Sequence, residues 1–245
     1  MVRSKVVFGL LLTVASISPM MAGPVSIQST LTNVDGTTQT DYTGYNTASW
    51  DQVTGLGTLT YVFSGTPGLH FFDVFLDHQM SLVFFNEYGS VLGAPAAGQS
   101  WEIGDSFASN IYPDVQAGGV LPNTNSLPGT TSNFANNCVG AACNGDFAAA
   151  MRFAFVLAVG ESELITLNAS LVDPGSGLRL VGTHPVDAAN PSAQSIYISG
   201  SAVACIVGET CVAAPGVPEP ASVLLLGSGL AILLAVSRRR SSINL

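Results

Sequence analysis

The chain has 245 residues, of which 9% are charged and 47% are hydrophobic. Seven basic and sixteen acidic residues give a net charge of -9, which excludes a basic nucleic-acid-binding protein. The hydrophobic content excludes a highly charged disordered chain. Long apolar runs occur only at the two ends, which excludes a polytopic membrane protein and leaves enough chain between them for one domain with a core.

The N-terminus has the three parts of a secretory signal peptide. Arg3 and Lys5 precede an almost uninterrupted apolar run over residues 6–17, and Ala22-Gly23 follows as the expected cleavage point. The run is short for a membrane span, so a cleaved signal over residues 1–22 is preferred to an uncleaved anchor. The expected partners at this stage are the secretion translocon and signal peptidase.

Between the two ends the chain is acidic. From Gly23 to Gly216 the basic residues are Arg152 and Arg179, against fifteen acidic residues, so this part has a net charge of -13. The acids are scattered and form no Asp-x-Asp-x-Asp-Gly calcium loop. General solubility is therefore the role expected of most of them.

Most of the body alternates apolar and polar residues, which is typical of half-buried strands. The runs are bounded by Gly, Pro, Asn and Asp, which favour turns. Residues 147–159 are compatible with a helix, but their alternation favours a strand. Residues 117–145, rich in Gly, Asn, Thr and Pro, are expected to form a long loop. The predicted strands are residues 57–63, 69–76, 81–85, 147–159, 164–172 and 194–199.

The cysteines form two local pairs, Cys138 with Cys143 and Cys205 with Cys211. Four cysteines allow three pairings, and closeness in sequence favours the local one. Because an exported protein meets an oxidising compartment, disulfide bonds are expected. A zinc site is the weaker interpretation, since the spacers lack the usual knuckle length and no histidine is close in sequence.

The densest polar group among apolar residues contains Asp73, Asp77, His78 and Glu87. On a regular strand residues 73 and 77 share a face, whereas His78 points to the opposite one. The carboxylates Asp73, Asp77 and Glu87 are candidate ligands for a hard cation such as calcium, or candidates for acid–base chemistry. The preferred interpretation is a solvated strand end with a hairpin near Asp77. No nucleophile elbow or phosphate-binding glycine loop is present, so no catalytic residue is assigned and no other cofactor is expected.

The C-terminus combines a Pro-Glu-Pro motif, an apolar run and a basic cluster. These are Pro218, Glu219 and Pro220, then residues 221–236, then Arg238, Arg239 and Arg240. As a helix the run would measure about 24 Å, which is marginal for a bilayer core of about 30 Å. The arginines would hold its far end on the cytoplasmic side, so a single crossing from outside to inside is expected.

This end resembles the PEP-CTERM sorting signal, in which a Pro-Glu-Pro motif precedes a short hydrophobic helix and a terminal basic cluster. The resemblance implies export by a Gram-negative bacterium and processing by an exosortase, a membrane-embedded transpeptidase-like cysteine protease. It implies a precursor anchored in the inner membrane that later reaches the cell surface or the extracellular matrix. The alternative is an ordinary single-pass anchor that is never cut.

The body also resembles a group of uncharacterised PEP-CTERM ectodomains, in the segments at residues 55–78, 84–89 and 98–103. Gln79 and Met80 stand where that group favours an acidic and an aliphatic residue. This second resemblance brings no known activity with it.

Together these features predict a mainly β protein, an antiparallel and jelly-roll-like β-sandwich with one C-terminal single-pass hydrophobic helix. The expected division is a signal peptide at 1–22, an exported β-rich domain at 23–211, a linker at 212–217 and a sorting tail at 218–245.

Two classes of function stay open. The first is a non-enzymatic surface or matrix protein that contributes to an envelope or exopolysaccharide layer. The second is an exported metal-dependent hydrolase, or a calcium-binding glycan-binding module, built on Asp73, Asp77 and Glu87. The first is preferred because the sequence contains no catalytic motif.

Overall fold

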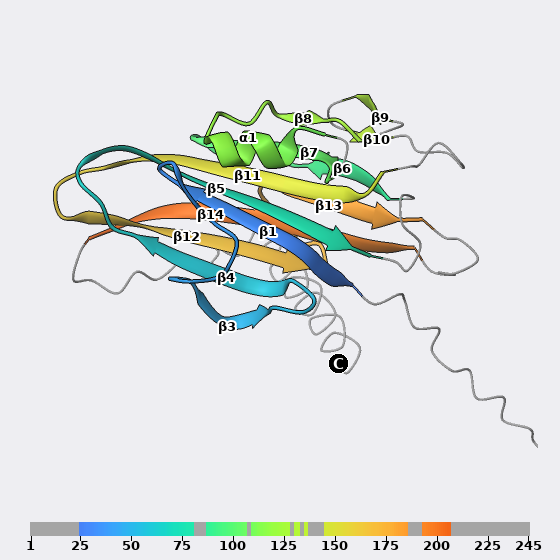
Figure 1. Ribbon diagram of the computed structural model, residues 1–245, viewed down its shortest axis with the longest axis horizontal. Helices are drawn as coiled ribbons and strands as arrows, with labels where there is room; N and C mark the ends of the chain where they lie inside the picture. Colours follow the sequence, from blue (N-terminus) through green and yellow to red (C-terminus); the bar gives the residue numbers. More distant parts are fainter. Residues whose placement is uncertain are drawn as a thin grey trace, which may run out of the picture.

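The computed structural model describes residues 25–80, 87–106, 109–127, 130–132, 135–136, 145–185 and 193–206. This part of the chain forms two large β-sheets, one above the other, with one short helix on the outside (Figure 1). The predicted mainly β fold is confirmed, while the jelly-roll comparison stays a prediction.

The first sheet has six strands in the order β2-β1-β5-β11-β7-β8. All neighbours are antiparallel except the parallel pair β7 and β8. In this order the strands are Thr37–Gln39, Ser26–Val34, Gly68–Gln79, Phe147–Leu157, Gln99–Asp105 and Thr124–Asn125.

The second sheet has six antiparallel strands in the order β3-β4-β12-β14-β13-β6. These strands are Asn46–Asp51, Leu56–Phe63, Glu161–Ser170, Gln194–Ile206, Arg179–His184 and Tyr88–Leu92. A small third sheet pairs β9 (Thr130–Ser132) with β10 (Ala135–Asn136), and the helix α1 spans Ile111–Ala117.

The two large sheets share one apolar core because alternate residues of their strands point inward. In β5 the even-numbered Phe72, Val74 and Leu76 face the second sheet, where they join Leu59 and Ile165. Trp101, with no exposed surface, lies in the same core. This burial of alternating residues supplies most of the stability expected of a fold of this kind.

A second, smaller core lies on the outer face of the first sheet. The odd-numbered Phe75 of β5 points to this side and packs with Leu31 and Ala148 against Ile111 and Val115 of α1. The helix has only seven residues, so it would not be stable alone and depends on this packing.

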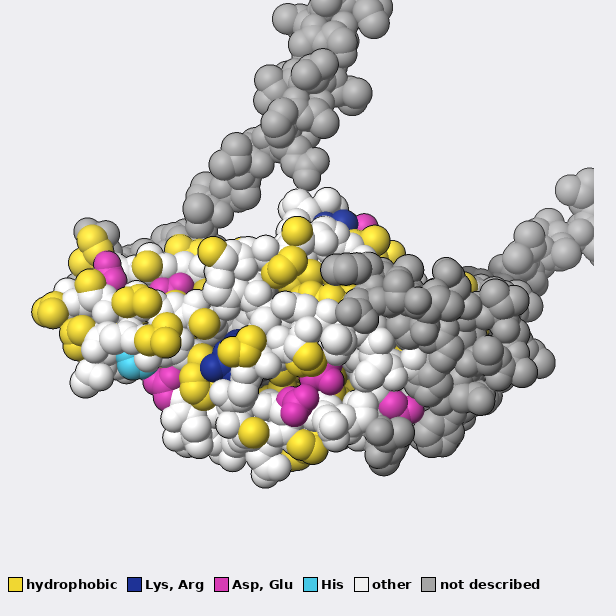
Figure 2. Space-filling view, turned by 90° about the horizontal axis from the view of Figure 1, so that it is seen from above, with side chains coloured by type: hydrophobic (Ala, Val, Ile, Leu, Met, Phe, Trp, Pro, Cys, Tyr) yellow, Lys and Arg dark blue, Asp and Glu magenta, His cyan; other side chains and the backbone are white. Residues whose placement is uncertain are grey.

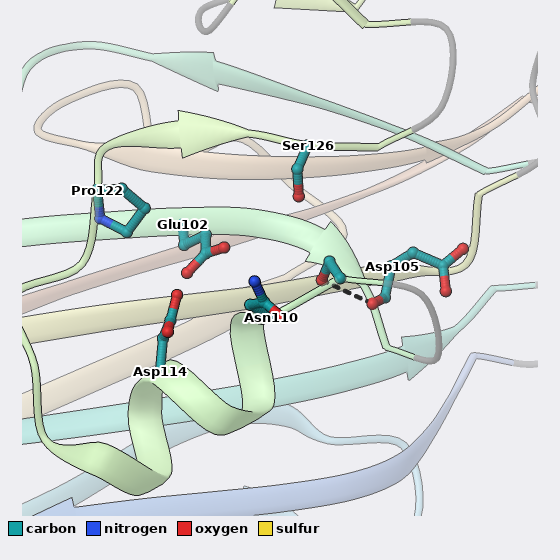
Figure 3. A pocket seen from close by; sticks show the side chains of 7 residues that line it. Glu102, Asp105, Asn110, Asp114, Pro122 and Ser126 are labelled. Atoms are coloured by element: carbon teal, nitrogen blue, oxygen red, sulfur yellow. Dashed lines mark hydrogen bonds between the residues drawn. The ribbon is translucent and has the colours of Figure 1, made fainter.

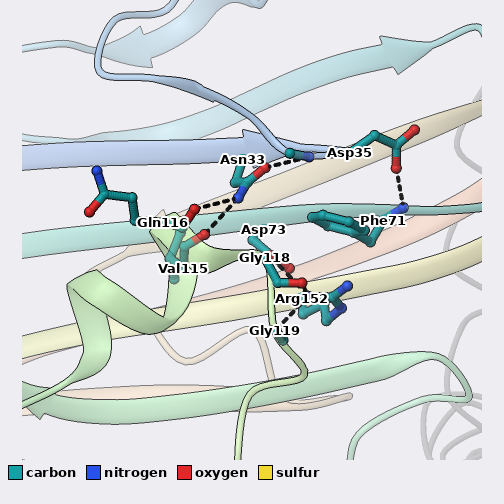
Figure 4. A network of polar contacts seen from close by, with 10 residues as sticks. Asn33, Asp35, Phe71, Asp73, Val115, Gln116, Gly118, Gly119 and Arg152 are labelled. Carbon is teal, nitrogen blue, oxygen red and sulfur yellow. Dashed lines mark hydrogen bonds and ion pairs between the residues drawn. The ribbon is translucent and has the colours of Figure 1, made fainter.

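Polar side chains of the sheet hold the C-terminal end of α1 (Figure 4). Asn33 of β1 donates from Nδ2 to the carbonyl oxygens of Val115 and Gln116, at 2.9 and 3.0 Å. Arg152 of β11 donates to the carbonyl oxygens of Gly118 and Gly119. The N–H of the C-cap residue Gly118 already donates to the Val115 carbonyl, and the two side chains of the sheet add partners for the other carbonyls at and just after the helix end.

The same Arg152 forms a buried ion pair with Asp73 of β5, with Nη1 and Oδ2 3.0 Å apart. Its guanidinium also lies 4.0 Å from the ring centroid of Phe71. Arg152 and Asp73 are register partners on adjacent strands. One cation therefore joins two strands of the sheet to the end of the helix.

The predicted strands at residues 57–63, 69–76, 147–159, 164–172 and 194–199 are confirmed as β4, β5, β11, β12 and β14, with shifted ends. The choice of a strand over a helix for residues 147–159 was correct. The prediction of one long loop at residues 117–145 was wrong in part, because β8, β9 and β10 lie inside it. The predicted strand at residues 81–85 lies outside the described residues.

Several terminal predictions fall on residues that are not described. These are the signal peptide, the linker, the sorting motif with its apolar run and arginines, and the cysteines Cys138, Cys143 and Cys211. Cys205 lies in β14, and no free cysteine is found in the described segments. The cysteine pairing therefore stays a prediction. Within the described segments, no helix has the length and hydrophobicity needed to cross a membrane.

The contacts of Arg152 with Asp73 and with the carbonyls at the end of α1 form a tether between sheet and helix. The two arginines of the body provide a matched test of this tether. We expect Arg152→Met to lower the free energy of unfolding by about 3 kcal/mol, because it leaves the Asp73 carboxylate buried without its cation. Arg179→Met is the control: its partner Asp173 has a side chain that is 38% exposed, so a loss of less than about 1 kcal/mol is expected. Urea denaturation of both variants measures the difference. Equal losses would contradict the role given to Arg152.

Candidate functional site

Many of the acidic side chains are buried, which corrects the expectation of a solvated strand end and of acids that serve mainly solubility. In the described segments the buried acids are Asp73, Asp77, Glu87, Glu102, Asp105, Asp146 and Glu163. Burying a carboxylate is costly unless it is paired, hydrogen-bonded or protonated. Each of these groups therefore needs a physical explanation, and the explanations differ.

Glu87 joins the two sheets at one end of the sandwich. It directly precedes β6 and is fully buried. Its Oε1 accepts from the backbone N–H of Met80 at the end of β5, and its Oε2 accepts from the N–H of Phe147 at the start of β11, both at 2.9 Å. Burial raises the pKa of Glu87 to about 8, although these two backbone donors oppose the shift. Both carboxylate oxygens thus have a structural partner.

Asp77, Asp105 and Asp146 lie together where β5 and β7 end and β11 begins. Asp146 accepts from the Ser106 hydroxyl at 2.8 Å, and its backbone N–H donates to the Asp105 carboxylate at 3.2 Å. Asp77 accepts from the Ser29 hydroxyl at 3.2 Å. Burial raises the pKa of Asp77 to about 7, with a further contribution from the Asp146 carboxylate. One oxygen of Asp77 and one of Asp146 have no hydrogen-bond partner.

The structure separates Asp73 from Asp77 and Glu87, whose charges interact with one another. Asp73 and Asp77 do share the outer face of the first sheet, as expected from their spacing. Four residues along a strand nevertheless span about 13 Å, which is too far for one ion to bridge directly. Asp73 pairs with Arg152, whereas Asp77 and Glu87 are electrostatically coupled to Asp146. No group of three or more His, Cys, Asp or Glu side chains suited to a metal was found among the described residues.

His78 points to the inner side of β5, as predicted, and is fully buried. Its Nε2 lies 3.0 Å from the carbonyl oxygen of Gly55. Burial lowers the pKa of His78 to about 4, so the ring is neutral at physiological pH. It is a structural histidine of the core.

An acidic pocket of about 500 Å³ lies between β7 and the start of α1 (Figure 3). Glu102 projects from β7 and Asp114 from the first turn of α1, and their carboxyl groups point toward one another. The remaining lining residues are Asp105, Ser109, Asn110, Pro122 and Ser126, so no basic side chain lines it among the residues that the structure describes.

The local structure explains why Glu102 and Asp114 meet. Glu102 alternates with the core residues Trp101 and Ile103, so it must face the helix side of the sheet. The apolar contacts of α1 then place its first turn over this point. Ser109 supports the turn before the helix by donating from Oγ to the carbonyl oxygen of Asp105 at 2.7 Å.

Glu102 is only 4% exposed, and its Oε2 has no hydrogen-bond partner. Burial raises the pKa of Glu102 to about 7, and the neighbouring Asp114 carboxyl adds to the shift through its charge and through a side-chain hydrogen bond. The helix start contributes a further uncommitted group, because the side chain of the N-cap residue Asn110 makes no capping hydrogen bond. The pocket therefore concentrates negative charge and oxygen atoms with few internal partners.

The face that carries α1 has few charges (Figure 2). Acidic side chains appear in it singly or in small groups among uncharged surface, and hydrophobic side chains gather toward one end. The charge of the body is thus not spread as an even acidic coat on this face.

Glu102 and Asp114 were not predicted from the sequence as site residues. One local pattern could have indicated the helix that carries Asp114. An acidic residue and Pro113 lie in its first turn, and Gly118 follows its last residue. Gly118 adopts the left-handed conformation, with φ of 68°, that commonly ends helices. A seven-residue helix shows too little periodicity to be recognised from the apolar pattern alone.

Comparison with known proteins identifies one feature. Residues 216–240 match the PEP-CTERM protein-sorting motif. No curated protein and no solved structure matches the chain. The sorting motif marks an exported, envelope-associated protein that is processed by an exosortase, in agreement with the resemblance of the C-terminus. No catalytic family is identified.

The buried carboxyls predict an unusual dependence of stability on pH. The pKa values of Asp77, Glu87 and Glu102 are raised above their unfolded values. The protonated carboxyls therefore stabilise the folded state fully below about pH 4, and this stabilisation is lost as the pH rises through about 7 to 8. His78 has the opposite effect, because its lowered pKa destabilises the folded state as the pH falls below about 6.5. It is one group against three carboxyls.

In a chelator-containing buffer we therefore expect the free energy of unfolding to rise by about 2 kcal/mol or more between pH 8 and pH 5.5. Urea denaturation at several pH values measures it. The variant Glu102→Gln should show a smaller rise, because it removes one of the titrating groups. A stability that falls steadily over this interval would contradict the assignment.

Proposed function

We propose that the chain is a non-enzymatic structural or binding protein of an exopolysaccharide or envelope layer, sorted by an exosortase through its C-terminal motif. The observation that carries this proposal is the match of residues 216–240 to the sorting motif, at the end of a chain whose body is a two-sheet β fold. In this proposal the Gram-negative inner membrane holds the precursor, and cleavage then delivers the body to the cell surface or the matrix.

The composition of the body fits such a location. Its net charge of -13 favours solubility, and its few cations leave little surface for binding anionic polymers directly. A rigid fold of two packed sheets suits a component that must persist outside the cell. The exopolysaccharide expected as a partner is therefore neutral, or is bound through an intermediate cation.

The alternative function is a metal-dependent hydrolase or a calcium-binding glycan-binding module that uses Asp73, Asp77 and Glu87. It has less support because Asp73 is paired with Arg152 and Glu87 accepts two backbone hydrogen bonds. Asp73 and Asp77 each keep one oxygen without a hydrogen-bond partner, but Asp73 is already neutralised by its arginine. An enzyme that used this set would first have to break the contacts of Asp73 and Glu87.

Processing is tested by the intact mass and the C-terminal peptide of the protein purified from its own host. We expect a terminus near Pro218, with the apolar run and the arginines removed. In a strain without the exosortase, and in the variant Pro220→Ala, the tail should be retained. Pro215→Ala, a proline just outside the motif, is the matched control and should be cut normally. A chain that ends at Leu245 in the wild-type strain would make the protein a single-pass anchor.

The role in a matrix is tested by retention on the host's own exopolysaccharide. The purified mature protein should be retained on the immobilised polymer and eluted by soluble polymer, because a structural component needs a lasting contact with its layer. Heat-unfolded protein is the control for nonspecific adsorption. A folded sample that no host polymer retains would count against the glycan-binding form of the proposal.

A further inference from the structure

We propose that the pocket between β7 and α1 binds one divalent cation of the calcium type, with Glu102 and Asp114 as its carboxylate ligands. This site differs from the set predicted from the sequence, and it does not depend on the sorting or matrix role of the protein.

The first argument is the missing counter-charge. Glu102 and Asp114 face one another in a largely buried setting, and the residues that line the pocket include no Lys, Arg or His (Figure 3). Both arginines of the body are committed elsewhere, Arg152 to Asp73 and Arg179 to Asp173. No cationic side chain of the lining can therefore balance the pair.

The second argument is an oxygen atom without a partner. Glu102 is 4% exposed, and its Oε2 is buried without a hydrogen bond. A buried acceptor of this kind costs about 1–3 kcal/mol, and more when it is charged. A cation in the pocket would give this oxygen a partner and would convert the repulsion between the two carboxylates into attraction to a shared ion.

The third argument is the chemistry of the lining. Calcium takes six to eight oxygen ligands in flexible geometry, drawn from carboxylates, amide and hydroxyl oxygens and water. Asn110, whose side chain is not used for capping, and Ser126 supply neutral oxygens beside the two carboxylates. The volume of about 500 Å³ holds an ion together with several waters, each of about 30 Å³. The described segments contain no group of three or more His, Cys, Asp or Glu side chains suited to a metal. The proposed site therefore has two carboxylate ligands, and neutral oxygens and water complete the coordination.

The test is calcium titration of the full-length chain in a non-ionic detergent, after removal of metals with a chelator, at pH 7.5. We expect one saturable site by calorimetry and a melting temperature that rises with calcium concentration. Glu102→Gln and Asp114→Asn should each weaken binding by at least about tenfold, since even outer partners of metal ligands contribute tenfold or more. Affinity should also fall at pH 5.5, because protons compete for the same carboxylates.

Glu163→Gln is the matched control, a buried glutamate of β12 in the second sheet, and it should bind calcium as the wild type does. Glu102→Gln removes the repulsion, so without metal it should melt at a temperature no lower than that of the wild type, which shows that the variant is folded. The proposal is overturned if calcium leaves the melting temperature of the wild type unchanged. That result is expected if Glu102 and Asp114 only share a proton. It is also overturned if binding survives in both Glu102→Gln and Asp114→Asn.

Discussion

The contact between Arg152 and the end of α1 is the interaction on which the helix-covered face of the first sheet, with its acidic pocket, depends. A seven-residue helix has too few internal hydrogen bonds to persist alone, and it is held on the outer face of the first sheet by apolar packing and by the bonds from Arg152 to the carbonyls that follow its last residue. The apolar residues beneath the helix fix its height, while Asn33 and Arg152 fix its C-terminal end. The opposite end, with Asp114, is then positioned over Glu102. A pocket at one end of the helix is thus a consequence of a tether at the other.

The parts of the fold that were predicted correctly are those whose pattern is local. Strands such as β4 and β12 are covered by the core mainly on one face, so their side chains alternate in the sequence. β5 is buried on both faces and was recognised from its apolar and aromatic run instead. β7 was missed because it is also buried on both faces, Trp101 by the core and Glu102 on the helix side, but has too few apolar residues to form such a run. The spacing of Asp73 and Asp77 correctly gave a shared face, but spacing alone does not show what covers that face.

The candidate site could not be predicted because its chemistry is made by distant parts of the chain. Asp73 and Arg152 are 79 positions apart, and no local rule pairs them. Glu87 looks like a surface acid in the sequence, yet it accepts hydrogen bonds from the ends of two strands of the other sheet. Composition suggested that the acids keep the protein soluble, whereas burial and backbone contacts give several of them a structural role. The sorting tail is the opposite case, since its motif is contiguous and needs no fold to be recognised.

A body with only two arginines must neutralise most of its buried acids by means other than salt bridges. The structure shows three solutions side by side: an arginine for Asp73, backbone N–H groups for Glu87, and hydroxyl and backbone donors for Asp146 and Asp105. Glu102 and Asp114 use none of these fully, because one oxygen of Glu102 keeps no partner. What remains for them is a charge supplied from outside, either a proton or a metal cation. For an exported protein both are set by the surroundings, so the stability of the helix-covered face becomes coupled to the ionic conditions outside the cell.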